Sequence, residues 1–258
     1  MLRDMTKNDW LSWLDLKPEL VPEALILRGT RNLKRHYAEY QAYFVDVVEI
    51  GSPNGLFEDI FIGRLGRLRV AYASVYGAPM ASEIAHLFGV LGTRLVVQTG
   101  CCGGLADEFD TGDLFIAEEA FCGEGAAQYY RNDRTPSSAK VRPSTPVNQW
   151  EALPGAENAR LCSGKLFSTA ALLAEGDAEL AAWHADGFAA VDMETAATLA
   201  VAEHFGMKSA SILFVFDNPR RQDHLLLTSE AKHQCRLAAN RRMNELALAL
   251  IASYFCQH

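Results

Sequence analysis

Three segments of the sequence could carry chemistry, because each places glycine or acidic residues directly after an apolar run. In the first, Leu95–Val97 leads into Gly100–Gly104, which reads Gly-Cys-Cys-Gly-Gly. In the other two, Glu194 follows a short apolar run and Asp217 ends the apolar stretch Ser209–Phe216. Runs of this kind are typical of buried strands, and ligands commonly bind at the carboxyl ends of such strands. The recurrence of the pattern favours a ligand site over a set of unrelated turns.

Each segment has a functional and a structural interpretation. The glycines let backbone N–H groups approach a ligand, or they simply form a tight turn. Glu194 could accept hydrogen bonds from two neighbouring hydroxyl groups, or it could provide favourable charge at the positive end of a helix. Asp217 could act as a general acid if burial raises its pKa, or it could form an Asx turn before Asn218.

Composition and charge exclude several classes of protein. The 258 residues are 49% hydrophobic, which indicates a globular chain with a large core. A formal net charge of −8 argues against duplex nucleic acid as the main partner. The motifs of serine hydrolases, P-loop NTPases, dinucleotide-binding proteins and zinc peptidases are absent, and the seven histidines lack ligand spacing. We therefore expect neither a metal nor a cofactor.

Cysteine usage and the first residues bear on location. None of the six cysteines forms a CxxC pair, so reduced thiols in the cytoplasm are expected. The first 20 residues carry charges throughout, which is unlike a signal peptide. No apolar run approaches the ~18 residues needed to span a bilayer, so no membrane association is expected.

The apolar patterns predict an α/β fold with a twisted, mixed central β-sheet flanked by helices. We expect a single domain over residues 1–258, with 1–20 as an N-terminal helical extension. The unit from Leu68 to Val97 reads as strand, helix and strand, which predicts parallel pairing. Residues 131–149 are polar and contain prolines, and we expect a long loop there. The other expected strands cover 24–27, 57–62, 114–117, 162–167, 189–191 and 209–216, and the main helices include 192–205 and 229–254.

Taken together, the motifs resemble those of the nucleoside phosphorylase and nucleosidase superfamily. This superfamily includes purine nucleoside phosphorylases, uridine phosphorylases, AMP nucleosidases and methylthioadenosine nucleosidases. The resemblance rests on GCCGGL, on GEG before a tyrosine pair, on VDMET at a helix start and on a buried strand ending in Asp217. It covers roughly residues 25–254. DMETA and DNP are closest to the AMP nucleosidases, whereas GKLFST is closer to the phosphorylases.

The resemblance implies roles for the matching residues and a homo-oligomer, from dimer to hexamer. Glu194 would bind the ribose 2′- and 3′-hydroxyls, with Met193 against the sugar, and Asp217 would protonate the departing base. Uridine-specific members generally lack this aspartate, so its presence favours a purine nucleoside or nucleotide. The other implied site residues are Phe167, Cys101, Cys102 and Gly103 for the substrate, and Gly29, Arg31, Gln98 and Gly100 around the acceptor, which is phosphate or water.

Departures from the family pattern leave the acceptor open. Phosphorylases usually carry an arginine where this chain has Gln98, although Arg28 or Arg31 could supply the missing charge. Methylthioadenosine nucleosidases place a water-activating glutamate just after the glycine that corresponds to Gly29, and this chain has none there. Phosphorolysis is slightly favoured. Hydrolysis, as in the AMP nucleosidases, and nucleoside binding without turnover are the alternatives.

Overall fold

One mixed β-sheet forms the centre of the protein, in a computed structural model that describes residues 1–52, 54–131 and 140–256. Its strands are β1 (Ala24–Gly29), β2 (Val45–Glu49), β3 (Ile60–Leu65), β4 (Leu68–Val75), β5 (Leu95–Gly104), β6 (Leu114–Gly123), β7 (Lys140–Val141), β8 (Leu161–Thr169), β9 (Phe188–Asp192) and β10 (Lys208–Asp217). They lie in the order β10-β6-β8-β9-β5-β1-β4-β3-β2, and β7 pairs with β6 beside this path.

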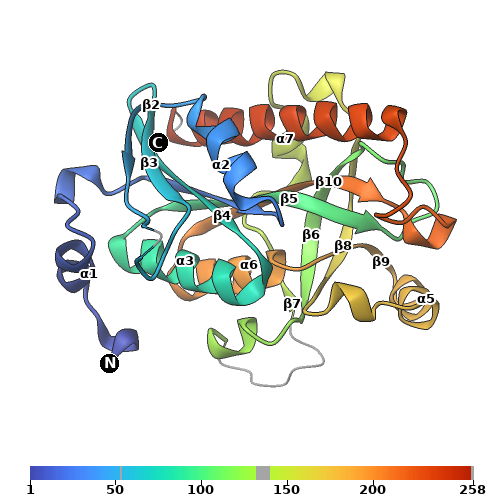
Figure 1. Ribbon diagram of the computed structural model, residues 1–258, viewed down its shortest axis with the longest axis horizontal. Coiled ribbons are helices and arrows are strands. Elements are labelled where there is room, and N and C mark those ends of the chain that lie inside the picture. Colours follow the sequence, from blue (N-terminus) through green and yellow to red (C-terminus); the bar gives the residue numbers. More distant parts are fainter. Residues whose placement is uncertain (53, 132–139, 257–258) are drawn as a thin grey trace.

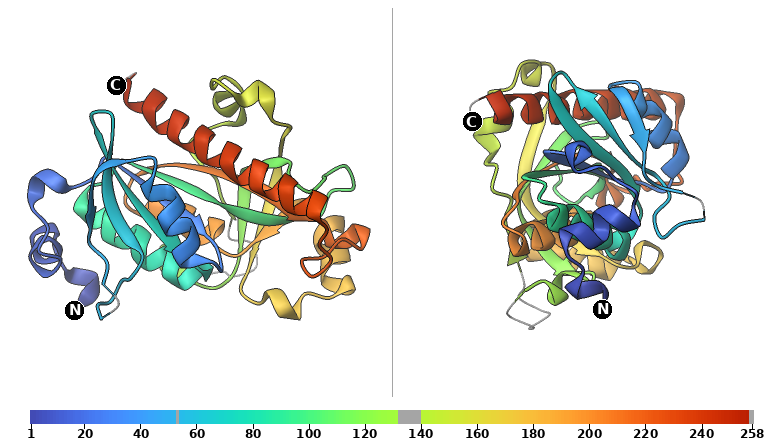
Figure 2. Two further views of the ribbon diagram at one scale, coloured as in Figure 1. Left: turned by 45° about the horizontal axis from the view of Figure 1, so that its top comes forward. Right: turned by 90° about the vertical axis from the view of Figure 1, so that its left-hand side faces the viewer.

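Helices cover both faces of the sheet, which confirms the predicted α/β class. The α-helices are α1 (Lys7–Trp13), α2 (Leu33–Gln41), α3 (Gly77–Leu91), α4 (Val147–Glu151), α5 (Asp177–Ala185), α6 (Thr195–His204) and α7 (Glu230–Cys256). Short 3₁₀ helices cover Leu2–Asp4, Pro18–Leu20, Ala127–Tyr129, Ala156–Asn158, Leu172–Ala174 and Pro219–Arg221. In Figure 1, α7 runs along one face of the sheet, and α3 and α6 lie along the opposite face. Figure 2 shows α1 at the outer end of the molecule, away from α5.

Strand β5 lies where the sheet divides. It pairs in parallel with β1 from Leu95 to Thr99, whereas its last residues, Gly103 and Gly104, pair with β9. Along its other side it pairs in parallel with β10. Because β10 connects through β6 and β8 to β9, these five strands form a closed ring, and β1 begins an open arm. On the side of β5 that β1 and β9 share, no described strand pairs with Gly100–Cys102, which pair only with β10 on the other side. A division of this kind is where ligands bind in α/β sheets.

The residues of β1 alternate between two apolar cores. Ala24 and Ile26 pack on the α7 side, whereas Leu25 and Leu27 pack on the α3 side. The next two residues continue this alternation, so Arg28 lies toward α7 and Gly29 lies toward α6. The β4–α3–β5 connection places both of its strands parallel to β1, which confirms the predicted parallel unit.

Two local predictions were wrong. Residues 131–149 do not form one long loop: 132–139 lie outside the described residues, but β7 pairs with β6 and α4 begins after Pro146. The fully buried Trp150 anchors α4 in the core beside α7. The strand expected at 57–62 is shifted, because β3 covers Ile60–Leu65. Strand β2 was not predicted, since all its side chains are exposed at the sheet edge and leave no alternating pattern.

Three further properties concern the described chain as a whole. All six cysteines are free thiols. Of the helices in the described ranges, none has both the length and the apolar character needed to cross a bilayer. Within those same ranges, no three histidine, cysteine or acidic side chains converge in a way that could hold a metal ion.

Candidate active site

A cavity of about 350 Å³ opens at the carboxyl ends of β1, β5 and β10, beside the start of α6. We call it the strand-end cavity. All three segments nominated from the sequence contribute to its wall, and all but three of the predicted site residues line it. Those lining it are Gly29, Arg31, Cys101, Cys102, Gly103, Met193, Glu194 and Asp217.

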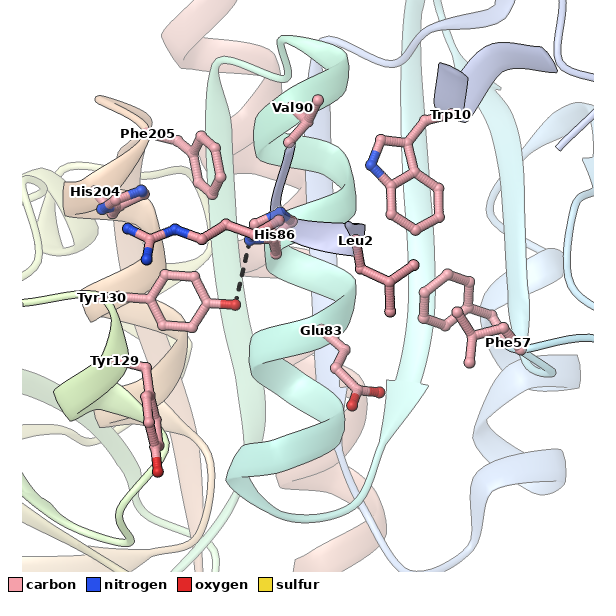
Figure 3. A pocket seen from close by; sticks show the side chains of 12 residues that line it. Leu2, Trp10, Phe57, Glu83, His86, Val90, Tyr129, Tyr130, His204 and Phe205 are labelled. Carbon is pink, nitrogen blue, oxygen red and sulfur yellow. Dashed lines mark hydrogen bonds between the residues drawn. The ribbon is translucent and has the colours of Figure 1, made fainter. Parts of the chain in front are cut away.

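A second cavity, of about 430 Å³, lies between the N-terminal segment, α3 and the end of α6. Figure 3 shows Trp10 and Phe57 on one side of it and Tyr130 and His204 on the other. The Tyr130 hydroxyl lies 3.2 Å from Nδ1 of His86, so these polar groups are paired with one another. None of the residues nominated from the sequence lines this cavity. The chemistry is therefore assigned to the strand-end cavity, although it is the smaller of the two.

The Glu194 carboxylate is almost completely buried and is held between three elements. Its Oε1 accepts a hydrogen bond from the N–H of Gly77, the first residue of α3, at 2.7 Å. Its Oε2 faces Gly29 so closely that a Cβ on Gly29 would lie 2.6 Å from it. The pKa of Glu194 is raised by burial and by the negative charge of Asp192, and the Gly77 N–H and Arg28 partly oppose this effect. The position brings an acidic side chain to the cavity wall in a nearly dry environment.

Asp192, and not Glu194, caps helix α6. The Asp192 carboxylate accepts a hydrogen bond from the Thr195 N–H at 2.8 Å and others from the Ser168 and Thr195 hydroxyls. The Ala196 N–H is bonded to the Ser168 hydroxyl at 3.0 Å. Glu194 occupies the N-cap position, but its side chain makes no capping bond. Glu194 is therefore not the cap of α6; its Oε1 instead contacts the first N–H of α3, and its Oε2 faces Gly29 at the cavity wall.

Asp217 ends β10 with its carboxyl group buried at the cavity wall. It makes no hydrogen bond within the described part of the chain, so it forms no Asx turn. The turn is stabilised instead by Asn218, whose amide donates to the carbonyls of Ala106 and Phe109 at 2.8 and 3.2 Å. Burial and the nearby Asp223 raise the pKa of Asp217 to about 7. A carboxyl group with this pKa can donate a proton near neutral pH.

The β5 loop provides neutral groups and room. Burial raises the pKa of Cys101 to about 11, and burial raises that of Cys102 as well, so both remain thiols at neutral pH. The Cys102 thiol is turned toward the Phe214 carbonyl, 3.7 Å away. A Cβ on Gly103 would lie 3.1 Å from Val191 and 3.6 Å from the Asp217 carboxylate, so glycine leaves space beside the acid.

Three predicted site residues lie outside the cavity wall. Gln98 is fully buried behind Gly29, where its amide accepts from the Thr198 hydroxyl at 2.7 Å and donates to the Thr99 carbonyl at 3.0 Å. Gly100 packs against the backbone of Gly29. Phe167 stacks on Trp183 with ring centres 4.6 Å apart, in the cluster beneath α5. Their proposed contacts with a ligand stay predictions.

Sequence reasoning missed Glu175, which also lines the strand-end cavity. Its Oε1 is buried and has no hydrogen-bond partner among the described residues. Burial, and secondarily the charge of Asp217, raise the pKa of Glu175 to about 7. The position of Glu175 in the sequence indicated a site only weakly, because Glu175 follows β8 but a 3₁₀ turn separates it from the end of the strand. Two carboxyl groups therefore face the same region of the cavity.

Comparisons of sequence place this chain among phosphorylases. The family model described as the phosphorylase superfamily matches residues 26–252. A purine nucleoside phosphorylase of DeoD type from Clostridium beijerinckii is 24% identical over 246 residues, which cover 90% of this chain and 94% of that protein. A guanosine phosphorylase from Halorubrum lacusprofundi is 25% identical over 144 residues, which cover 55% of this chain and 58% of that protein.

Solved structures show the same fold. A uridine phosphorylase from Vibrio fischeri superposes with a TM-score of 0.76 at 19% identity, covering 93% of this chain and 96% of that one. The same enzyme in complex with 6-hydroxy-1-naphthoic acid gives a TM-score of 0.73, also at 19% identity and covering 93% and 95% of the two chains. At this identity the likeness concerns the fold alone. The match over residues 26–252 shows that the chain belongs to the phosphorylase superfamily, as its motifs predicted.

Proposed function

We propose that this protein cleaves the N-ribosidic bond of a purine nucleoside, with phosphate as the acceptor. The observation that carries the proposal is the convergence of two buried acids with different surroundings on one cavity. Glu194 is fixed by Gly77 and by close packing on Gly29, whereas Asp217 has no hydrogen-bond partner among the described residues and a pKa of about 7. Such a pair can hold a sugar with one carboxylate and protonate a leaving group with the other.

The chemistry follows from these positions. The bond between C1′ of the ribose and the purine nitrogen breaks, and its electron pair departs with the base. Asp217 donates its proton to the base as the negative charge develops, while Glu194 binds the 2′- and 3′-hydroxyls of a sugar with oxocarbenium character. An oxygen of phosphate then bonds to C1′, which gives ribose 1-phosphate and the free purine.

A purine is favoured by two observations. Asp217 and Glu175 both have pKa values raised to about 7, so this region of the cavity can donate or accept hydrogen bonds at the edge of a base. The relatives of this chain include a guanosine phosphorylase and purine nucleoside phosphorylases. The uridine phosphorylase structures support the fold and do not bear on the base.

Product analysis tests the proposal. The protein is incubated with inosine, guanosine, adenosine or uridine, with and without phosphate, and both the base and the sugar product are identified. We expect release of purine bases that requires phosphate and yields ribose 1-phosphate. Free ribose formed equally fast without phosphate would establish hydrolysis instead. A preference for uridine, or no release from any nucleoside, would contradict the proposal.

The contact between Gly29 and Glu194 gives a second prediction. Gly29→Ala should lower kcat/KM about 10–100-fold, because the new methyl group displaces the carboxylate that binds the ribose. The φ angle of Gly29 is not in the left-handed region, so the backbone itself tolerates alanine. Gly55→Ala is the matched control, since a Cβ there has no neighbour closer than 3.4 Å.

A double-mutant cycle separates this effect from general damage. In the Glu194→Ala background the carboxylate is gone, and Gly29→Ala should then cause little further loss. If the two substitutions instead reduced kcat/KM independently, the Gly29 effect would not act through Glu194.

The pKa of Asp217 gives a third prediction. Because the proton donor is the protonated form, kcat at saturating phosphate should decrease as the pH rises above about 7. Asp217→Asn should lower kcat for guanosine by about 10²–10⁴-fold and abolish this alkaline limb. It should affect 7-methylguanosine much less, because the base of that nucleoside is already cationic and departs as a neutral molecule without a proton from Asp217.

Glu175→Gln is the control, since Glu175 titrates in the same range. The alkaline limb should persist in this variant. Loss of the limb in Glu175→Gln and its retention in Asp217→Asn would assign the proton donor to Glu175.

A further inference from the structure

Arg28 is a buried cation that has no ion-pair partner among the described residues. It lies at the end of β1 in the strand-end cavity, and the residue is only 2% exposed. Its Nη1 donates to the Met243 sulfur at 3.4 Å, and its guanidinium carbon lies 5.6 Å from the centre of the Phe214 ring. Its Nε has no hydrogen-bond partner among the described residues, and no described acidic group lies within ion-pair distance of it.

Such a group is expensive to bury in the absence of an anion. A guanidinium cannot lose its proton in a protein, and it has five N–H donors to satisfy. A thioether is a weak acceptor, and an aromatic face satisfies no donor directly. Buried charges are normally paired or hydrogen-bonded, so an unpaired one at a cavity wall points to an anionic ligand.

The neighbouring titratable groups do not provide that anion. The pKa of His36 is lowered to about 4 by burial and by Arg28, so this imidazole is neutral near pH 7. Cys101 remains a thiol, and burial raises the pKa of Tyr40 and Tyr72 so that both stay neutral. Glu194 senses the charge of Arg28, but its Oε1 is bonded to Gly77 and its Oε2 packs against Gly29.

Gln98 does not supply the missing contacts either. Its amide oxygen and nitrogen are both engaged, with Thr198 and with the Thr99 carbonyl, and the residue lies outside the cavity wall. Arg28 is on the neighbouring strand, paired in register with Thr99. Nε of Arg28 is therefore a buried donor of the cavity wall that has no partner among the described residues. The other arginine that lines the cavity, Arg31, has its guanidinium carbon 4.8 Å from the centre of the Tyr76 ring.

We propose that Arg28 binds the phosphate acceptor, taking the place that an arginine at position 98 would otherwise have. This inference rests on the proposed function. A phosphate group could also come from the 5′ position of a nucleotide, and the binding measurements below distinguish the two sources. Arg28 directly precedes Gly29, whose α-carbon packs against the carboxylate assigned to the 2′- and 3′-hydroxyls.

Direct binding of phosphate tests the proposal without requiring turnover. Thermal unfolding is followed with increasing potassium phosphate, against potassium chloride at equal ionic strength. Wild type and Arg35→Met, whose arginine is exposed on α2 and paired with Glu39, should both be stabilised by phosphate. Arg28→Met should show no phosphate-dependent shift, and Arg28→Lys should retain a reduced one.

The ligand-free proteins distinguish a ligand-binding role from a structural one. If Arg28 serves the ligand, Arg28→Met should unfold at the same temperature as wild type or at a higher one, because a buried unpaired charge is removed. A large decrease in that temperature, with phosphate stabilisation retained in Arg28→Lys at the wild-type level, would overturn the proposal. Stabilisation of wild type by a nucleoside 5′-monophosphate but not by phosphate would also overturn it.

Kinetics provide the second readout. In Arg28→Lys we expect the KM for phosphate to increase at least about tenfold, with the KM for the nucleoside nearly unchanged. An unchanged KM for phosphate would contradict the assignment. If no nucleoside is cleaved by wild type, the proposed function fails, but the binding measurements still decide whether Arg28 holds phosphate.

Discussion

The packing of the Glu194 carboxylate against the α-carbon of Gly29 is the constraint on which the site depends. A Cβ at position 29 would lie 2.6 Å from Oε2, so any other residue there would displace the carboxylate. The same carboxylate also fixes the start of α3 through the Gly77 N–H. The ends of β1, β4 and β9 therefore meet around one acidic group. This arrangement is possible because Asp192 and Ser168 cap α6 and leave Glu194 free of that task.

Burial of charge is the second feature that organises the cavity. Burial raises the pKa values of four acidic residues at the cavity, Asp192, Glu194, Asp217 and Glu175. Arg28 is buried at the same cavity and has no ion-pair partner in the described part of the chain. Groups placed in this way destabilise the empty protein, and functional sites often carry such a cost. A sugar hydroxyl on Glu194, a base beside Asp217 and an anion on Arg28 would each relieve part of it. In our account, substrate binding and the relief of unfavourable burial are the same event.

The sequence predicted the fold class, and the segments that it nominated for a site meet at one cavity, because both depend on patterns that are local in the chain. Apolar runs ending in glycine or acid marked β5, β9 and β10. Their ends meet because β10 pairs in parallel with β5 and the end of β9 pairs antiparallel with the end of β5. Local patterns did not predict the direction in which individual side chains point. Gln98 belongs to a matching motif but turns toward Thr198, and Phe167 turns toward Trp183. Glu175 and the buried state of Arg28 arise from contacts between distant segments, which no local pattern reveals.

A crystal structure with a purine nucleoside and sulfate, a mimic of phosphate that cannot react, would test the account most directly. We expect the nucleoside in the strand-end cavity, with its 2′- and 3′-hydroxyls within hydrogen-bond distance of Glu194 and an edge of its base at Asp217. Sulfate should contact the Arg28 guanidinium on the side of C1′. A nucleoside bound instead in the cavity between α1 and α3, or with its ribose away from Glu194, would contradict the account.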